Sequence, residues 1–121
     1  MKKILMVGTG GTIASEMTAE GLAPELNTEQ LLEFIPDIGK FCRVDCLQLY
    51  NLDSTNIRPA DWLGVADILR KSYDAYDGFV ISHGTDTMAY TAAALSYLVQ
   101  GSAKPIVLTG AQKPIWFDGT D

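Results

Sequence analysis

The stretch Val7–Gly8–Thr9–Gly10–Gly11–Thr12–Ile13–Ala14–Ser15 directly follows an apolar run, and it predicts where the chain leaves a strand and turns. Glycine has no Cβ and tolerates positive φ, so the three glycines allow a sharp turn whose N–H groups approach a ligand closely. The hydroxyls around them would then lie at the carboxyl end of a strand, where open α/β sheets bind ligands. Taken alone, the stretch fits an ordinary strand-to-loop turn equally well.

A second turn of the same kind, His83–Gly84–Thr85–Asp86–Thr87, follows another short apolar run. Strands and helices are expected to alternate along the chain. The expected order is strand Lys3–Val7, helix Glu29–Ile35 capped by Thr28, strand Arg43–Tyr50, helix Pro59–Ser72, strand Gly78–Ser82, helix Met88–Val99 and strand Pro105–Thr109. Ser15–Asn27 shows no clear period and is expected to be a loop, whereas Met88–Val99 is apolar on most sides and is expected to be largely buried.

This alternation predicts an α/β fold, a flavodoxin-like or Rossmann-like parallel sheet with helices on both faces. If the sheet has the order second, first, third and fourth strand, the first and third strands are neighbours. The strand order reverses between them, which creates a crevice. The two glycine–threonine turns would then lie side by side at that crevice.

Composition and charge narrow the class of protein. With 121 residues, 47% of them hydrophobic, the chain can form one small globular domain. The net charge is −6 without any cluster of Lys or Arg, which argues against nucleic-acid or polybasic membrane partners. The apolar run before the glycines is too short for a signal peptide, and no run reaches transmembrane length, so a cytoplasmic location is expected.

The cysteines indicate neither a disulfide nor a metal site. Cys42 and Cys46 fall in one extended segment, about 13 Å apart at roughly 3.3 Å per residue, which is beyond disulfide reach. With His83 as the only histidine, they make no metal quartet. No metal and no cofactor are expected, and the thiols are interpreted as core or half-buried thiols of a cytosolic protein.

The expected crevice is rich in hydroxyls and carries one strong candidate carboxylate, Asp86. A hydroxyl can act as a nucleophile once a base takes its proton, and N–H groups next to glycines can hold an oxyanion. Other chemistries fit less well: Ile13 stands where a dinucleotide fingerprint needs its third glycine, and no Walker lysine occurs. A Ser–His–Asp triad is weak because His83 directly abuts its own glycine turn, so His83 is interpreted as structural or as a wall of the pocket.

The two glycine–threonine turns and the residues around them resemble the sequence motifs of a known family. Thr9-Gly-Gly-Thr-Ile-Ala14 and Gly78-Phe-Val-Ile-Ser-His-Gly-Thr-Asp-Thr-Met88 resemble the two signature motifs of bacterial-type L-asparaginases of the cytoplasmic type. The resemblance extends over essentially the whole chain. It implies hydrolysis of the side-chain amide of L-asparagine to aspartate and ammonia by a threonine nucleophile, through an acyl-enzyme and without a cofactor.

The resemblance also implies roles for individual residues. Thr12 resembles the attacking threonine, and Thr85 the second threonine that activates water or assists proton transfer. Asp86 resembles the carboxylate that receives the substrate's α-ammonium group. The loop with Ser54 and Thr55 resembles the one that holds the α-carboxylate. Backbone groups of three further residues are expected to line the amide and oxyanion positions: Gly11, Gly84 and Ala111.

Two departures from the family pattern limit what this chain is expected to do alone. Leu22 stands where the family usually carries a tyrosine that orients the nucleophile, and the family's catalytic lysine lies further along the chain than Asp121. Residues 1–121 are therefore interpreted as a partial N-terminal α/β catalytic domain without the C-terminal domain. The chain alone is expected to hydrolyse asparagine negligibly, and the full-length protein is expected to be a homo-oligomer.

Two other functions remain open at this point. The glutaminase subunit of a tRNA-dependent amidotransferase belongs to the same superfamily, but it normally carries an additional N-terminal domain. A non-catalytic amino-acid-binding module would use Asp86 and the Ser54 loop without needing Thr12. Preference for asparagine over glutamine depends on one methylene, worth about 1–3 kcal/mol, and the sequence does not decide it.

Overall fold

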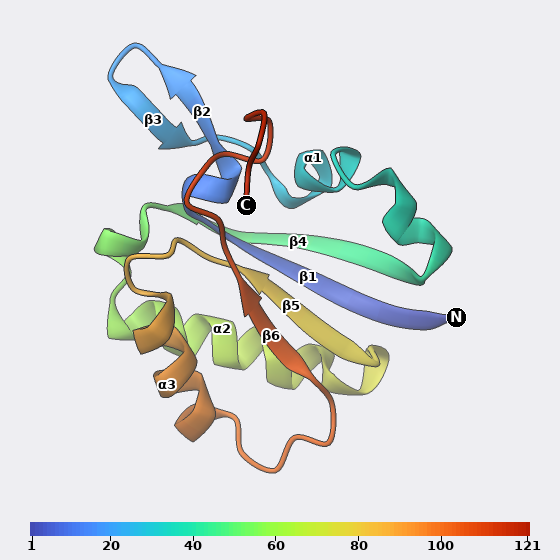
Figure 1. The fold of residues 1–121 in the computed structure, drawn as a ribbon. Helices are drawn as coiled ribbons and strands as arrows, with labels where there is room; N and C mark the ends of the chain where they lie inside the picture. The colour runs from blue at the N-terminus through green and yellow to red at the C-terminus, as the bar shows by residue number, and fades with distance from the viewer.

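The computed structural model describes residues 1–121, and its centre is a four-stranded parallel sheet (Figure 1). The strands are β1 (Lys2–Gly10), β4 (Cys42–Leu52), β5 (Gly78–Ser82) and β6 (Ile106–Thr109). Their order is β4-β1-β5-β6, and every neighbouring pair is parallel. The predicted order is therefore confirmed, and the strand order reverses between β1 and β5 as the crevice requires.

Helices cover both faces of this sheet, as predicted. In Figure 1, α2 (Pro59–Ser72) and α3 (Met88–Leu98) lie on one face and α1 (Thr28–Glu33) on the other. The larger core lies between the sheet and α2 with α3: Leu5, Val7, Val65, Ala66, Leu69, Phe79, Ile81 and Leu95. The smaller core lies under α1: Met6, Ala14, Leu26 and Leu31.

The helices begin where local chemistry satisfies their first N–H groups. Pro59 begins α2, and the Arg58 N–H before it donates to Asp61 Oδ2 at 2.7 Å. The cap of α1 is Asn27, whose side chain accepts from the Gln30 N–H. The expected Thr28 cap was wrong: Thr28 lies inside the helix and is buried, and its N–H donates to Gln48 Oε1 at 2.9 Å.

The expected loop at Ser15–Asn27 contains a hairpin instead. Strands β2 (Ser15–Thr18) and β3 (Gly21–Pro24) pair antiparallel and project from the end of β1 (Figure 1). Gly21 has φ +114°, and its carbonyl accepts from Thr18 Oγ1 at 2.7 Å, which closes the turn between the strands. The sequence carries no signal for these strands because neither alternates apolar and polar residues.

Helix α3 is more exposed than its composition predicts. Only Thr91 and Leu95 are buried, whereas Tyr90 and Tyr97 are 67% and 77% exposed. Because α3 contacts the sheet and α2 along one narrow stripe, its alanine-rich remainder faces outward. The expectation that this helix is largely buried was wrong.

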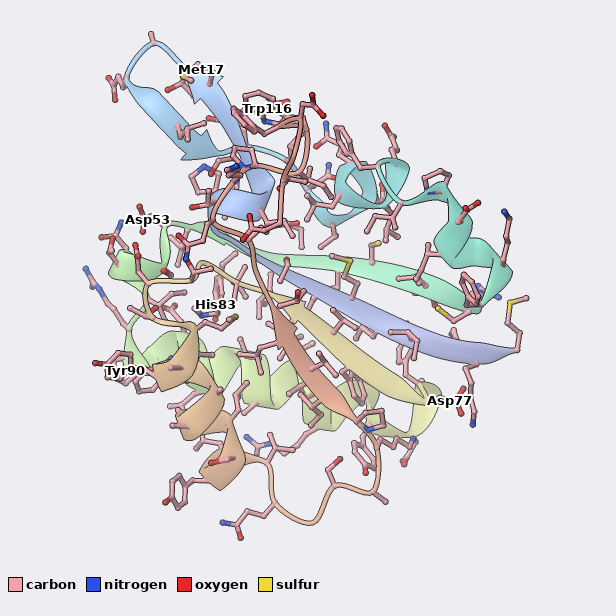
Figure 2. All side chains as sticks on the ribbon, viewed as in Figure 1. Met17, Asp53, Asp77, His83, Tyr90 and Trp116 are labelled. Carbon is pink, nitrogen blue, oxygen red and sulfur yellow. The ribbon has the colours of Figure 1, made fainter.

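Four short 3₁₀ turns complete the chain: η1 (Thr12–Ala14), η2 (Pro36–Lys40), η3 (Ser54–Asn56) and η4 (Tyr73–Ala75). The irregular C-terminal segment packs back against η1 and the base of the hairpin. The Ile115 N–H donates to Ile13 O at 3.1 Å, and Trp116 Nε1 donates to Ser15 O at 2.7 Å (Figure 2). None of the helices is both long and apolar enough to pass through a lipid bilayer.

The α1 face of the sheet is only partly covered. A groove lined mainly by apolar side chains runs beside α1 across this face, with Met6, Val80, Val107 and Ile115 among its walls. Val107 in β6 is 50% exposed there. The groove is thus an apolar surface that residues 1–121 do not fill.

Asp77 connects the start of β5 to the start of β1, and its replacement by asparagine tests that link (Figure 2). Its carboxylate accepts from the Lys3 N–H at 2.7 Å and from Lys2 Nζ at 3.2 Å, and these bonds lower the pKa of Asp77 below its ordinary value. A carboxyl with a lowered folded-state pKa stabilises the fold above its ordinary pKa, and this contribution disappears as the pH falls through the folded-state value.

We therefore expect the free energy of unfolding of the Asp77→Asn variant to fall less steeply than that of the parent protein between about pH 5 and pH 3. Urea unfolding followed by circular dichroism at several pH values measures this slope. Asp74→Asn is the matched control, because Asp74 is exposed and its replacement removes the same charge without that backbone bond. Identical slopes for the parent and Asp77→Asn would refute the contribution.

Candidate active site

The two glycine–threonine turns meet at the carboxyl ends of β1 and β5. Gly10 and Gly11 have φ +104° and +84°, so the chain turns sharply as it leaves β1. The Gly11 N–H donates to Leu52 O at 3.0 Å, which ties this turn to the end of β4. A Cβ on Gly11 would overlap the backbone of Gly84, and a Cβ on Gly84 would lie 2.6 Å from Ser54 Oγ. Three loops therefore approach each other at backbone distance.

These loops surround a pocket of about 180 Å³. Its wall has ten residues: Gly11, Thr12, Ser15, Leu22, Pro24, Asp53, Ser54, Gly84, Thr85 and Asp86. The wall is almost entirely polar, and its only charged side chains are two carboxylates, Asp53 and Asp86. A cationic group thus finds charged partners here, whereas an anionic group must be bound by N–H groups and hydroxyls.

Most of the predicted site residues lie on this one pocket, although they come from three separate loops. The six are Gly11, Thr12, Ser54, Gly84, Thr85 and Asp86. Thr55 and Ala111 are not on its wall. Thr55 is exposed, and its hydroxyl and N–H both donate to Asp53 Oδ1, at 2.8 and 2.9 Å. Ala111 is buried and lines a neighbouring hollow with Gly110.

Four wall residues were not among the predicted site residues. Leu22 and Pro24 belong to β3, so they reach the pocket only because the hairpin folds over η1. Leu22 is 50% exposed at the position where the resemblance expects a tyrosine. Ser15 holds the first turn through its hydroxyl, which donates to Gly11 O at 3.0 Å. Asp53 caps η3; it follows the second predicted strand, in the stretch over which the family resemblance extends, but no role was predicted for it.

The two threonine hydroxyls have different surroundings. Thr85 Oγ1 accepts from Gln112 Nε2 at 3.2 Å, which links the β5 loop to the loop after β6. Thr12 lies at the start of η1, partly exposed, and its hydroxyl has no hydrogen-bond partner within the chain. Asp86 is exposed at the mouth of the pocket. The pocket thus receives one unbonded hydroxyl from the turn after β1, and a hydroxyl and a carboxylate from the turn after β5.

Comparison with known proteins assigns the chain to a family. A family model described as "Asparaginase, N-terminal" matches residues 3–121, almost the whole chain. The chain belongs to the asparaginase family. The resemblance carried by the two turn motifs is therefore confirmed, and so is the α/β fold it implied.

Relatives within the family include proteins with two different names. The chain is 40% identical to an L-asparaginase of Thermococcus kodakarensis over 98% of its length, and the structure of that thermostable enzyme superposes with a TM-score of 0.89. It is also 40% identical, over 92% of its length, to a glutamyl-tRNA(Gln) amidotransferase subunit of Saccharolobus solfataricus. The structure of a probable cytoplasmic L-asparaginase from Campylobacter jejuni is 34% identical, with a TM-score of 0.86.

The chain is shorter than these relatives. It spans 37% of the T. kodakarensis protein, 36% of the C. jejuni chain and 26% of the S. solfataricus protein. The family membership thus concerns the N-terminal portion of such proteins.

Proposed function

We propose that residues 1–121 form the nucleophile-bearing part of an L-asparaginase, which hydrolyses the side-chain amide of L-asparagine to L-aspartate and ammonia. One observation carries the proposal: Thr12 from the β1 turn and the Thr85–Asp86 pair from the β5 turn line the same small polar pocket. Membership of the asparaginase family supports the same chemistry.

In the proposed mechanism Thr12 Oγ attacks the amide carbon after losing its proton. The tetrahedral intermediate collapses as the nitrogen takes up a proton and leaves as ammonia, so an ester to Thr12 remains. Water, activated on the Thr85 side, attacks this ester and releases the carboxylic acid with a regenerated hydroxyl. Backbone N–H groups of the close-packed glycine turns hold the developing oxyanion.

The charges on the wall support a defined orientation of the substrate. Asp86 receives the α-ammonium group, because a carboxylate and an ammonium form a strong charge-assisted hydrogen bond. Ser54, which is buried in the loop after β4, receives the α-carboxylate together with neighbouring N–H groups. The proposed roles of Thr55 and Ala111 stay predictions; for Thr55 the nearest observed link to the pocket is its bond to Asp53.

Further polypeptide belongs to the proposed enzyme. Residues 1–121 cover little more than a third of the asparaginase relatives, and the apolar groove beside α1 is left unfilled. We propose that a following part of the chain fills this groove and supplies the family's lysine, and that the full-length protein is a cytoplasmic homo-oligomer. The cytoplasmic assignment is supported by the name of the C. jejuni relative.

The glutaminase subunit of a tRNA-dependent amidotransferase is the second candidate. The observation in its favour is the 40% identity to the S. solfataricus amidotransferase protein, equal to that of the asparaginase relative. Both candidates share the threonine chemistry and differ in the side chain that carries the amide. Ammonia release by the full-length protein separates them, with asparagine preferred by the first and glutamine, in the presence of glutamyl-tRNA, by the second.

Replacing Asp86 by asparagine tests the orientation of the substrate. A charge-assisted hydrogen bond contributes about 1.5–3 kcal/mol, so we expect KM for L-asparagine to rise about tenfold to a hundredfold, with a smaller change in kcat. Succinamic acid, which lacks the α-amino group, has no ammonium for Asp86 to bind. Its hydrolysis is expected to be equally slow with the parent and Asp86→Asn.

The comparison needs four rates of steady-state ammonia release: those of the parent and of Asp86→Asn, each with L-asparagine and with succinamic acid. Asp118→Asn is the matched control, since Asp118 is exposed and lies outside the pocket. An equal loss on asparagine and succinamic acid would show that Asp86 does not bind the ammonium group. If neither asparagine nor glutamine is hydrolysed by the full-length parent, the binding-module interpretation replaces the enzyme.

A further inference from the structure

A chain of three buried or partly buried side chains lies directly beneath the pocket. His83 and Thr91 are each only 1% exposed. His83 Nε2 lies 2.8 Å from Thr91 Oγ1, and Trp62 Nε1 donates to the same hydroxyl at 2.9 Å. His83 Nδ1 lies 2.7 Å from Gly84 O. Figure 2 shows His83 at the end of β5, on the side of the sheet that α2 and α3 cover.

The donors and acceptors of this chain fix the tautomer of His83. A carbonyl oxygen only accepts, so Nδ1 carries the hydrogen that binds Gly84 O. Thr91 accepts from Trp62 and uses its own hydrogen to donate to a bare Nε2, which satisfies every group. The hydrogen-bond pattern therefore assigns a ring hydrogen to Nδ1 of His83.

The bond to Gly84 O determines the direction of the next N–H group. The Gly84–Thr85 peptide is trans, since no cis peptide bond occurs in the chain, so its C=O and N–H point in opposite directions. The carbonyl points down to the buried imidazole, and the Thr85 N–H consequently points away from it, on the side where Gly84 and Thr85 line the pocket. The Thr85 N–H donates to no backbone carbonyl, so it is free for a ligand.

We propose that His83 is a positioning residue, which aims the Thr85 N–H at the amide oxygen of the substrate by holding Gly84 O in the core. This role rests on the proposed amide hydrolysis. The N–H then stabilises negative charge as it develops on that oxygen, while substrate affinity depends on other groups such as Asp86. Loss of the Nδ1 donor would leave the peptide free to rotate and would lower kcat far more than it changes KM.

Two replacements of His83 separate positioning from mere stability. In His83→Asn the side-chain amide places an N–H near the former Nδ1, whereas in His83→Gln it reaches the former Nε2 and loses the donor to Gly84. We expect His83→Gln to lower kcat about tenfold to a hundredfold, below the loss for deleting a whole oxyanion donor, and to change KM less than about threefold. We expect His83→Asn to retain kcat within about threefold.

The kinetics are measured on the full-length protein, with thermal unfolding of each variant as the measure of stability. Trp62→Phe is the control for the network, because it removes the outer donor and leaves the His83–Thr91 contact; its kcat is expected to stay within about threefold of the parent. Equal falls in kcat for His83→Asn and His83→Gln, in proportion to their loss of stability, would overturn the proposal.

A spectroscopic readout keeps this proposal separate from the proposed function. Long-range ¹H–¹⁵N spectra report the imidazole tautomer, and the His83 signal is the one absent from His83→Asn. We expect hydrogen on Nδ1, and a shifted Thr85 amide resonance in His83→Gln but not in His83→Asn. Hydrogen on Nε2 would overturn the positioning role even in an active enzyme. If the parent is inactive but gives the expected spectra, the proposed hydrolysis is refuted, whereas the orientation of the Gly84–Thr85 peptide by His83 still stands.

Discussion

Replacing Thr12 by valine is expected to lower kcat for amide hydrolysis at least about 1,000-fold while KM stays within a few-fold, since removal of a nucleophile eliminates the covalent route. Valine keeps nearly the shape of threonine but has no hydroxyl to attack. Thr12 is the hydroxyl to test because it lines the pocket and has no hydrogen-bond partner within the chain. Ammonia release and the binding of aspartate, the product, measure the two effects separately in the full-length protein.

Thr9→Val is the matched control for this prediction. Thr9 is 2% exposed, and its hydroxyl donates to Ser82 O at 2.7 Å, where it joins β1 to β5. Its loss is expected to cost about 1 kcal/mol of stability, as for an ordinary buried hydrogen bond, with turnover retained. If Thr12→Val binds and turns over like the parent, the nucleophile is elsewhere; binding retained with turnover lost supports the enzyme over the binding module.

Replacing Gly11 by alanine is expected to destabilise the fold strongly. The residue has φ +84° and ψ 177°, an extended conformation that essentially only glycine adopts and that costs other residues about 1–3 kcal/mol. The added Cβ would also overlap the backbone of Gly84, and such overpacking adds about 1–3 kcal/mol, so we expect a loss of about 2–6 kcal/mol in the free energy of unfolding. The two turns must also separate, so activity is expected to fall with it.

Two other glycines divide this effect into its parts. Gly21 has φ +114°, but a Cβ added there would meet nothing within 4 Å, so Gly21→Ala carries only the conformational cost. Gly39 has open space and no positive φ, so Gly39→Ala carries neither cost. In urea unfolding, the loss of stability is expected to be largest for Gly11→Ala, smaller for Gly21→Ala and smallest for Gly39→Ala. A loss at Gly11 no larger than at Gly21 would mean that the turns are not held together at this point.

The site depends on this close approach more than on any single interaction. Gly11, Gly84 and Ser54 come from loops after three different strands, and no two of them are neighbours in the sequence. Their contact brings an uncommitted hydroxyl, Thr12, opposite a hydroxyl and a carboxylate, Thr85 and Asp86. A wall with two carboxylates and no lysine or arginine favours a substrate that carries an ammonium group.

The sequence predicted the bounds of an element correctly where its local pattern reflects how the element is buried. The bounds of α2 and β5 were predicted to the residue, because Pro59 pre-sets a first helical turn and a short apolar run between polar loops is typical of a central strand. The composition of α3 misled, since an alanine-rich helix suggests burial on every side although only one stripe packs. A periodic pattern shows which residues of a helix are apolar. It does not show which other element packs against them.

Alternating strands and helices favoured the observed strand order, which brings the two glycine–threonine turns to the switch point, and together with the family resemblance the sequence named six residues of the pocket. This was possible because parallel strands place all their carboxyl ends at one edge, so residues that follow them must converge. Two features became visible only in the folded chain: the β2–β3 hairpin carries Leu22 and Pro24 to the pocket, and His83 binds Gly84 O beneath it. Those contacts depend on side-chain directions and on packing between segments that are distant in the sequence. Neither of these produces a periodic pattern in the sequence.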